Sequence, residues 1–142
     1  MSTPDLCNVC DSLINELGVP ANFWGFQYPH SGNGYSGIYV LSGSFDGREY
    51  ISSPLIKALL QNQFYEIKFY VSLADKILKA SIGSIGVYFS NDSIEGDTTT
   101  QVLSLFPQIQ NPKDSFLSDT LNWMIIVDTF LASGGERFIT IG

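Results

Sequence analysis

The sequence predicts an all-β fold: a jelly-roll-like β-sandwich of two antiparallel sheets, with a short helix or ordered loop at the N-terminus. The first observation is an alternation of apolar and polar residues over 65–73, which resumes over 84–90. A period of two indicates strands with one buried and one exposed face. The second is that 13% of the residues are aromatic, which favours strands. The third is the near-regular spacing of short apolar runs between turn residues, which is typical of sandwiches.

Length and composition indicate one domain over residues 1–142, with an N-terminal segment at 1–21 and the sandwich at 22–142. Of the 142 residues, 44% are hydrophobic and 15% are charged, which excludes a disordered chain. The net charge is −7 and only seven residues are basic. Because nucleic acids and anionic lipids are bound by clustered Lys and Arg, we expect no nucleic-acid partner. No apolar run reaches the roughly 18 residues of a membrane span, so we expect no membrane insertion.

The N-terminal segment 2–18 has the pattern of a short amphipathic helix. Thr3 suits the N-cap and Pro4 the first helical position. Gly18 and Pro20 would end the helix. A helix of this length is marginal alone, so it must pack on the sheet, and an irregular ordered loop is the alternative. The residues on the predicted apolar stripe are Leu6, Val9, Cys10, Leu13, Ile14 and Leu17.

Strands follow one another along the rest of the chain. They are expected over 23–27, 38–41, 48–52, 65–73, 85–90, 98–106, 121–132 and 136–141. The segment 54–61 fits either a helical turn or a strand. In the strand over 121–132 we expect Leu121, Trp123, Ile125 and Val127 to share one face, with Trp123 in the core.

Several stretches of the sequence agree in order and spacing with one known group of proteins. They are Gly37-Ile-Tyr-Val, Arg48-Glu-Tyr-Ile, 65–74, Ile85-Gly-Val-Tyr-Phe-Ser, Pro107-Gln-Ile-Gln-Asn, Asn122-Trp and Gly134-Gly-Glu-Arg-Phe-Ile-Thr-Ile-Gly. Together they resemble the extracellular β-sandwich modules of surface and outer-membrane-associated proteins of gliding Bacteroidota. Those modules are similar to galactose-binding-like jelly rolls. The resemblance covers most of the chain from Asn22 onward, and it implies a sandwich fold and a secreted, cell-surface location.

The start of the chain differs from that group and leaves two interpretations. Modules of this kind usually open with an extra strand upstream of the stretch that resembles Pro4-Asp5, whereas this chain begins almost there. A trimmed chain or a variant without the strand is the simpler interpretation. In the other, a neighbouring subunit supplies the strand by β-strand addition, and repeated head-to-tail contacts build a filament. The opening residues show no secretion signal, so from the residues alone a cytosolic protein and a secreted chain without its leader both stay open.

Cys7 and Cys10 form the only cysteine motif, Cys-x-x-Cys. A closed zinc site needs four ligands, and His30 is the only other soft ligand in the chain. We therefore predict a disulfide, either local or to a cysteine on another segment, in an oxidising compartment. Two buried free thiols are the alternative.

Asp followed by Ser or Thr is the most unusual local pattern. It accounts for six of the nine Asp residues, each time with Ser, Thr or an apolar residue next. The pattern resembles the acceptor motif of periplasmic O-glycosylation in Bacteroidota. The alternative is that these dipeptides serve as turns and caps. The resemblance implies O-linked sugar on some of Ser12, Ser93, Thr98, Ser115 and Thr120.

Aromatic residues surround the Gly-rich loop at 30–37, and aromatic rings stack on sugar faces. Tyr28, His30 and Tyr35 are therefore the candidate glycan-binding residues, whereas Trp24 is expected in the core. Tyr39 is an aromatic neighbour that fits either role.

An acidic loop offers the one candidate metal site. Asp92, Glu95 and Asp97 could hold Ca²⁺, but their spacing is not that of an EF-hand, and a solvated acidic loop is the favoured interpretation. We expect no other cofactor.

Two Arg–Glu neighbours remain, Arg48–Glu49 and Glu136–Arg137. A buried ion pair between the sheets is the favoured role for each, ahead of a two-carboxylate glycosidase site built from Glu49 and Glu136. No nucleophile elbow or catalytic triad is present.

These observations predict a non-catalytic, extracellular structural or adhesion module without catalytic residues. The expected partner is a second copy of the chain, joined by strand addition into a homo-oligomer or filament. The alternative is a carbohydrate-binding, lectin-like module, with or without Ca²⁺. A glycosidase ranks third.

Overall fold

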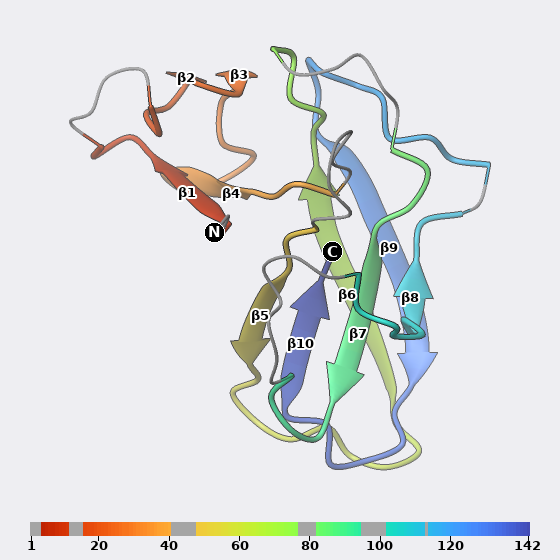
Figure 1. Ribbon diagram of the computed structural model, residues 1–142. Coiled ribbons are helices and arrows are strands. Elements are labelled where there is room, and N and C mark those ends of the chain that lie inside the picture. Colours follow the sequence, from red (N-terminus) through yellow and green to blue (C-terminus); the bar gives the residue numbers. More distant parts are fainter. Residues whose placement is uncertain (1–3, 12–15, 41–47, 77–81, 95–101, 113) are drawn as a thin grey trace.

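The computed structural model describes residues 4–11, 16–40, 48–76, 82–94, 102–112 and 114–142 (Figure 1). These residues contain ten strands and no helix, and every strand pair is antiparallel. The all-β prediction is confirmed for this part of the chain.

The larger layer is a four-stranded sheet. Its strands lie in the order β5 (Ile51–Pro54), β10 (Phe138–Ile141), β7 (Gly86–Ser90) and β8 (Ile109–Gln110). The central strand β7 explains why this layer forms, because Val87 and Phe89 point into the core while Tyr88 is only half-buried. The predicted strands over 85–90 and 136–141 correspond to β7 and β10.

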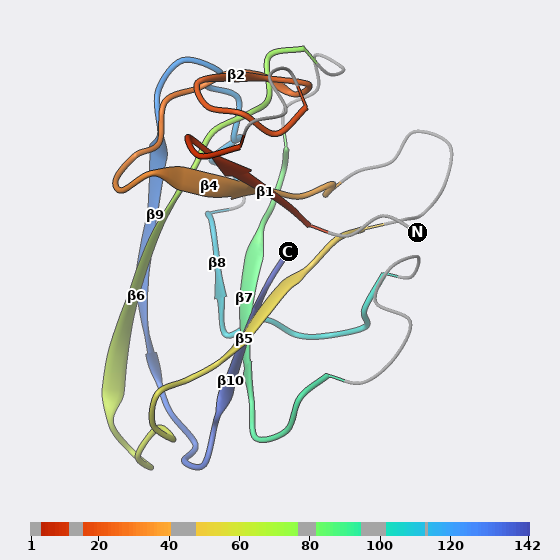
Figure 2. The same cartoon turned by 90° about the vertical axis from the view of Figure 1, so that its left-hand side faces the viewer.

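The second layer consists of β6 (Phe64–Val71) and β9 (Met124–Leu131), which pair over eight residues from Phe64–Leu131 to Val71–Met124. Figure 2 shows the two layers from the side, with β6 and β9 facing the four-stranded sheet. Their shared core includes Phe89 and Phe130, whose rings stack with centroids 4.4 Å apart. Burial of such rings drives the packing of one layer on the other.

The N-terminal strands form two small two-stranded sheets at one end of the two layers (Figure 1). β1 (Asp5–Asn8) pairs with β4 (Gly34–Gly37), and β2 (Ala21–Asn22) pairs with β3 (Gly25–Phe26). The predicted helix over 2–18 is therefore wrong for the described residues. The β4 strand offers β1 a hydrogen-bonding ladder, and a short helix has too few internal bonds to compete with one.

The prediction for β9 is wrong about which face enters the core. Ile126 and Phe130 are buried, whereas Ile125 and Val127 are about half-exposed. Both faces of this strand are apolar, so its alternation does not define the buried side. The register with β6 and the contact between Phe130 and Phe89 decide it.

Two predicted strands are not formed in the residues that the structure describes. Residues 38–40 lie outside any strand, and so do residues 102–106, the described part of the segment predicted as a strand over 98–106. The segment 54–61 is a strand only at its first residue, where β5 ends.

Candidate functional site

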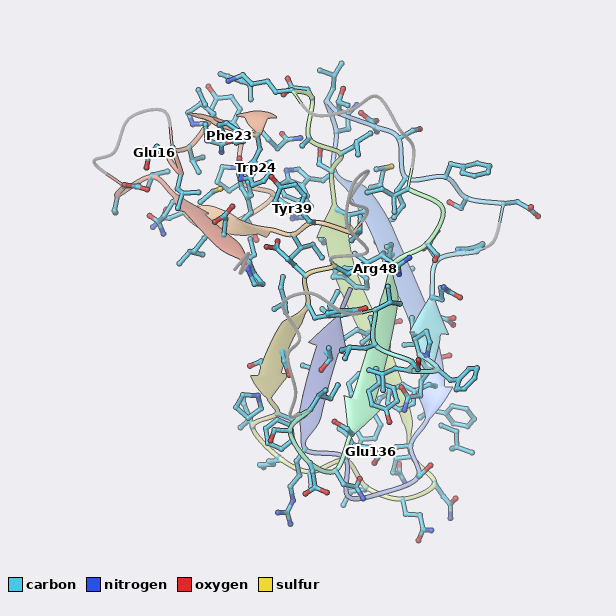
Figure 3. All side chains as sticks on the ribbon, in the orientation of Figure 1. Glu16, Phe23, Trp24, Tyr39, Arg48 and Glu136 are labelled. Atoms are coloured by element: carbon cyan, nitrogen blue, oxygen red, sulfur yellow. The ribbon has the colours of Figure 1, made fainter. Side chains whose placement is uncertain are left out.

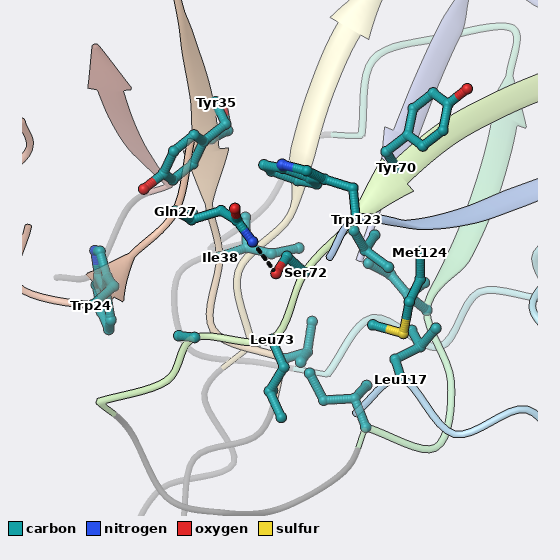
Figure 4. Close-up of a pocket in the computed structure, with 18 of the residues that line it drawn as sticks. Trp24, Gln27, Tyr35, Ile38, Tyr70, Ser72, Leu73, Leu117, Trp123 and Met124 are labelled. Atoms are coloured by element: carbon teal, nitrogen blue, oxygen red, sulfur yellow. Dashed lines mark hydrogen bonds between the residues drawn. The ribbon is translucent and has the colours of Figure 1, made fainter. Parts of the chain in front are cut away.

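An apolar cavity of about 440 Å³ lies between the two layers, beside the two small N-terminal sheets (Figure 4). Both layers contribute apolar side chains to its wall: Ile51, Phe69, Val71, Ile85, Met124 and Ile141. Trp24, Tyr35, Tyr39 and Trp123 add aromatic rings. Native interiors have few voids larger than a water molecule, so this part of the core lacks the atoms that would fill it.

Two stretches of backbone border the cavity. All seven residues of 69–75 line it, and so do all six residues of 35–40. Alternate side chains of an extended chain point to opposite sides, so consecutive residues can line one cavity only when the edge of the backbone faces it. The cavity therefore has the form of a slot between two extended segments.

The edge of β6 that faces away from β9 is unpaired in the described part of the chain, where β9 is the only strand bonded to β6. In an antiparallel pair, alternate N–H and C=O groups of each strand point away from the partner. Charged side chains protect such edges from other strands. Glu66 and Lys68 do so in the first half of β6, whereas the stretch 69–74 carries no charge. The unprotected half is the half that borders the cavity.

Trp123 joins the aromatic residues at the rim. Its indole Nε1 donates a hydrogen bond to the Tyr28 carbonyl oxygen at 2.8 Å. The Trp123 ring lies 5.6 Å from the Tyr35 ring and 6.4 Å from the His30 ring, both edge to face. His30 also stacks on Tyr70 with centroids 3.5 Å apart. The structure thus brings all three predicted glycan-binding residues to Trp123.

Trp123 was predicted as a core residue, so the sequence analysis missed its position at the rim. A turn at 119–122 directly precedes Trp123. In the sequence, this turn is the feature that could have placed Trp123 before the regular strand instead of within it. Trp24, also predicted in the core, lines the cavity and donates from Nε1 to the Asp5 carboxylate at 3.1 Å.

Several hydrogen bonds hold residues 22–28 against the ends of the β6–β9 layer. Gln27 Nε2 donates to Ser72 Oγ at 2.7 Å, and Lys76 Nζ donates to the Asn22 carbonyl oxygen at 2.8 Å. The Asp75 carboxylate accepts from the Phe26 N–H, and Trp123 Nε1 donates to the Tyr28 carbonyl oxygen. The close approach requires Gly25, because a Cβ there would collide with the Asp75 carboxylate. These contacts form one wall of the cavity.

Cys7 and Cys10 are free thiols in the structure, Cys7 buried and Cys10 exposed. Burial raises the pKa of the Cys7 thiol, and the charge of Asp5 raises it further. A protonated, buried thiol is a poor nucleophile, so Cys7 acts as a small packing residue beside Tyr35. The disulfide stays a prediction for an oxidising compartment.

Three of the five predicted O-glycosylation sites lie in the described residues. Ser93 and Ser115 are exposed and Thr120 is half-buried, whereas Ser12 and Thr98 lie outside the described residues. The Asp119 carboxylate accepts hydrogen bonds from the N–H groups of Leu121 and Asn122, both at 2.8 Å. For the Asp119–Thr120 pair, the turn-and-cap interpretation therefore has direct support.

Of the three candidate calcium ligands, Asp92 is exposed, and Glu95 and Asp97 lie outside the described residues. Within the described ranges no group of three His, Cys, Asp or Glu side chains is placed to hold a metal ion.

Glu49 and Glu136 are both buried, but they do not form a pair. Glu49 lies beside Gly142 at one end of the β5–β10 ladder, and Glu136 precedes the other end. Seven residues of strand at a rise of about 3.3 Å place them roughly 23 Å apart, beyond the 5–9.5 Å of two-carboxylate glycosidases. Figure 3 shows Glu136 far from Arg48, the neighbour of Glu49. Glu136 accepts hydrogen bonds from Ser133 N and Gly134 N instead of pairing with the exposed Arg137.

No family model matches the chain, and no curated protein or solved structure matches it either. The resemblance to Bacteroidota surface modules therefore stays a prediction, and the function has to be argued from the cavity and its edges.

Among the described residues, no helix is long and apolar enough to cross a membrane.

Proposed function

We propose that this chain is a jelly-roll-like β-sandwich short of one strand, and that it acts as a non-catalytic structural or adhesion module at the cell surface. Its site takes up an extended segment of a second copy of the chain. The observation that carries the proposal is the edge of β6 at 69–71, which is uncharged, is unpaired among the described residues and borders an apolar cavity of about 440 Å³. Repeated uptake from copy to copy would build a filament.

The size of the cavity supports the uptake of a ligand. Side chains that line an unfilled space lose the dispersion contacts that a close-packed core would give them, and this slot of about 440 Å³ is lined mainly by apolar side chains. The net stability of a domain is only about 5–15 kcal/mol. Filling the cavity therefore makes a large difference to the folded state.

The chemistry of the wall favours a strand over a sugar. The deep wall consists of side chains such as Phe69, Ile85 and Met124, which offer no partner to a hydroxyl group. A buried hydroxyl without a hydrogen bond costs about 1–3 kcal/mol in proteins. An extended segment instead places alternate apolar side chains in the cavity, while its backbone bonds to the edge of β6.

Photo-cross-linking from Met124 tests the proposal. The chain has two methionines, Met1 and Met124, and Met124 lines the cavity. Full-length protein labelled with photo-methionine is irradiated, and cross-linked peptides are identified by mass spectrometry. We expect covalent dimers in which Met124 is joined to a peptide of a second copy.

Met124→Leu is the matched control, since it keeps the cavity apolar and leaves photo-methionine only at Met1. Dimers that persist in this variant would come from Met1. Links from Met124 only to its own chain, at concentrations where the protein assembles, would contradict the proposal.

The second candidate function is glycan binding at the aromatic rim. The specific observation is that Tyr28, His30 and Tyr35 meet at Trp123. The Tyr28 ring meets the Phe26 ring edge to face, with centroids 5.4 Å apart, and Tyr28 is 63% exposed, so part of its ring is open to a sugar. A glycan array with wild type, Tyr28→Ala and the matched control Phe116→Ala tests it. Binding that is lost only in Tyr28→Ala would support this function, and an array without binding would dismiss it.

A further inference from the structure

The β6–β9 layer has a second open edge, on the side of β9 that faces away from β6. Among the described residues, β6 is the only strand bonded to β9. The side chains along this strand are largely apolar, and Ile125, Val127 and Leu131 are each about half-exposed. Apolar stretches on an open edge are prone to pair with other chains. Asp128 is the one charged residue in β9, so protection of this edge by charge depends on it.

The register of the ladder shows which backbone groups of β9 point to this edge. The Ala132 N–H donates a hydrogen bond to the Gln63 carbonyl oxygen at 2.9 Å, one step beyond the end of the β6–β9 pairing. Bonded and non-bonded pairs alternate along an antiparallel ladder, so the even-numbered residues of β9 bond to β6. The N–H and C=O groups of the odd-numbered residues point away from β6. The Thr129 N–H therefore faces the open edge.

The Asp128 carboxylate occupies this position. Its Oδ1 accepts a hydrogen bond from the Thr129 N–H at 2.7 Å. An incoming strand would need the same N–H for one of its carbonyl oxygens. The carboxylate thus takes the donor and places a negative charge where that carbonyl oxygen would lie. Asp128 lies between the buried Ile126 and Phe130 on the inner face of β9, yet its side chain is exposed, because the carboxylate reaches the solvent at the edge.

We propose that Asp128 closes the β9 edge against strand addition and so restricts the layer to one acceptor edge, that of β6. The closing of β9 is argued from the hydrogen bond and exposure of Asp128, whereas its consequence for the choice of edge rests on the proposed strand uptake. One acceptor edge per copy lets head-to-tail uptake extend a filament in a single line, whereas a second would branch it. The pair Asp128–Thr129 lies inside a strand, so this role also explains an Asp-Thr pair that no turn accounts for.

Photo-cross-linking from β9 tests the role of Asp128. Full-length Met124→Leu/Val127→Met protein is labelled with photo-methionine, so that the probe lies on β9 next to the edge and not in the cavity. Mass spectrometry counts only the cross-linked peptides that contain position 127. With Asp128 in place we expect few links to a second copy. Adding Asp128→Val should raise their yield roughly fivefold, because the freed Thr129 N–H can bond to another strand.

Two further variants on the same background separate the edge from net charge. Asp114→Val removes one negative charge at an exposed site outside the strands and should leave the yield within about twofold. Asp128→Asn keeps an oxygen that can accept from the Thr129 N–H but removes the charge, and should give an intermediate yield. It also decides the outcome if Asp128→Val fails to fold.

An unchanged yield in the folded Asp128 variants, or an equal rise with Asp114→Val, would overturn the proposal. Links from Met124 in the otherwise unchanged chain report uptake at β6. The two proposals therefore fail separately.

Discussion

Glu136 shows how a single buried polar side chain fixes a turn in this chain. Its carboxylate is 5% exposed and accepts hydrogen bonds from Ser133 N at 2.7 Å and Gly134 N at 2.9 Å. These bonds close the connection between β9 and β10, where Gly134 and Gly135 adopt positive φ. The two glycines in the sequence predict the turn, whereas the predicted partner of Glu136 was Arg137. The backbone N–H groups of the turn lie closer to the Glu136 carboxylate than the long Arg137 side chain, which can remain in water.

Glu136→Ala removes both acceptors and leaves two donors without a partner in the turn. We expect the free energy of unfolding to fall by about 3 kcal/mol, because each hydrogen bond to a charged group contributes about 1.5–3 kcal/mol. Urea denaturation measures the change. The exposed Glu16→Ala should stay within about 0.5 kcal/mol of wild type, and an equal loss in both variants would contradict this role of Glu136.

Asp119 gives a pH-dependent prediction. Hydrogen bonds from Asn122 N, Leu121 N and Asn122 Nδ2 hold the pKa of Asp119 below its ordinary value of 3.8. The stabilisation is therefore complete above pH 3.8 and is lost as the pH falls through the lower value of the folded state. Thermal unfolding of wild type and Asp119→Ala should differ at neutral pH and converge in acid. A difference that grows on acidification would contradict the assignment.

At the scale of elements, β6 and β9 differ in what their sequences reveal. In β6, polar Glu66 and Lys68 alternate with apolar residues, so the buried face follows from the pattern, and the structure has the same face buried. In β9, Ile125 and Ile126 are neighbours with the same hydropathy. Only pairing with β6 and packing against Ile85 and Leu117 decide that Ile126 enters the core.

The two isoleucines allow a matched test of this assignment. Ile126 is 5% exposed, so Ile126→Ala should lower the free energy of unfolding by about 3 kcal/mol through lost burial and a residual cavity. Ile125 is 53% exposed, and Ile125→Ala should cost less than about 1 kcal/mol. Denaturant unfolding of dilute protein measures both. If Ile125→Ala lowered the free energy of unfolding more than Ile126→Ala does, then Ile125 and not Ile126 would face the core.

At the scale of the whole molecule, the cavity is the feature that no local pattern predicted. Its walls come from β2, β3, β4, β5, β6, β9 and β10 and the segments between them, which are distant in the sequence. The sequence suggested a missing strand only through a resemblance. Among the described residues, the structure adds an unpaired β6 edge and an open cavity on the inner side of the same layer.

Filling the cavity from within the chain should replace the proposed ligand. Val71 lines the cavity, and Val71→Phe places a larger side chain, a phenyl ring, in it. We expect the free energy of unfolding of dilute protein to rise by about 0.5–2 kcal/mol and the intermolecular cross-links from Met124 to decrease. Val102→Phe, outside the cavity lining, is the control. Stabilisation with undiminished cross-linking would place the incoming segment elsewhere.

The sequence by itself determined the all-β class, the positions of the long strands and the buried face of β6, because a period of two and frequent turn residues are local properties. Only the tertiary structure decided the rest. It made β1 a strand where local pattern favoured a helix, turned Ile126 inward, gathered Tyr28, His30 and Tyr35 around Trp123 and left a cavity beside β6. These outcomes depend on pairing and packing between distant segments, and such contacts are not encoded in the pattern of any one segment.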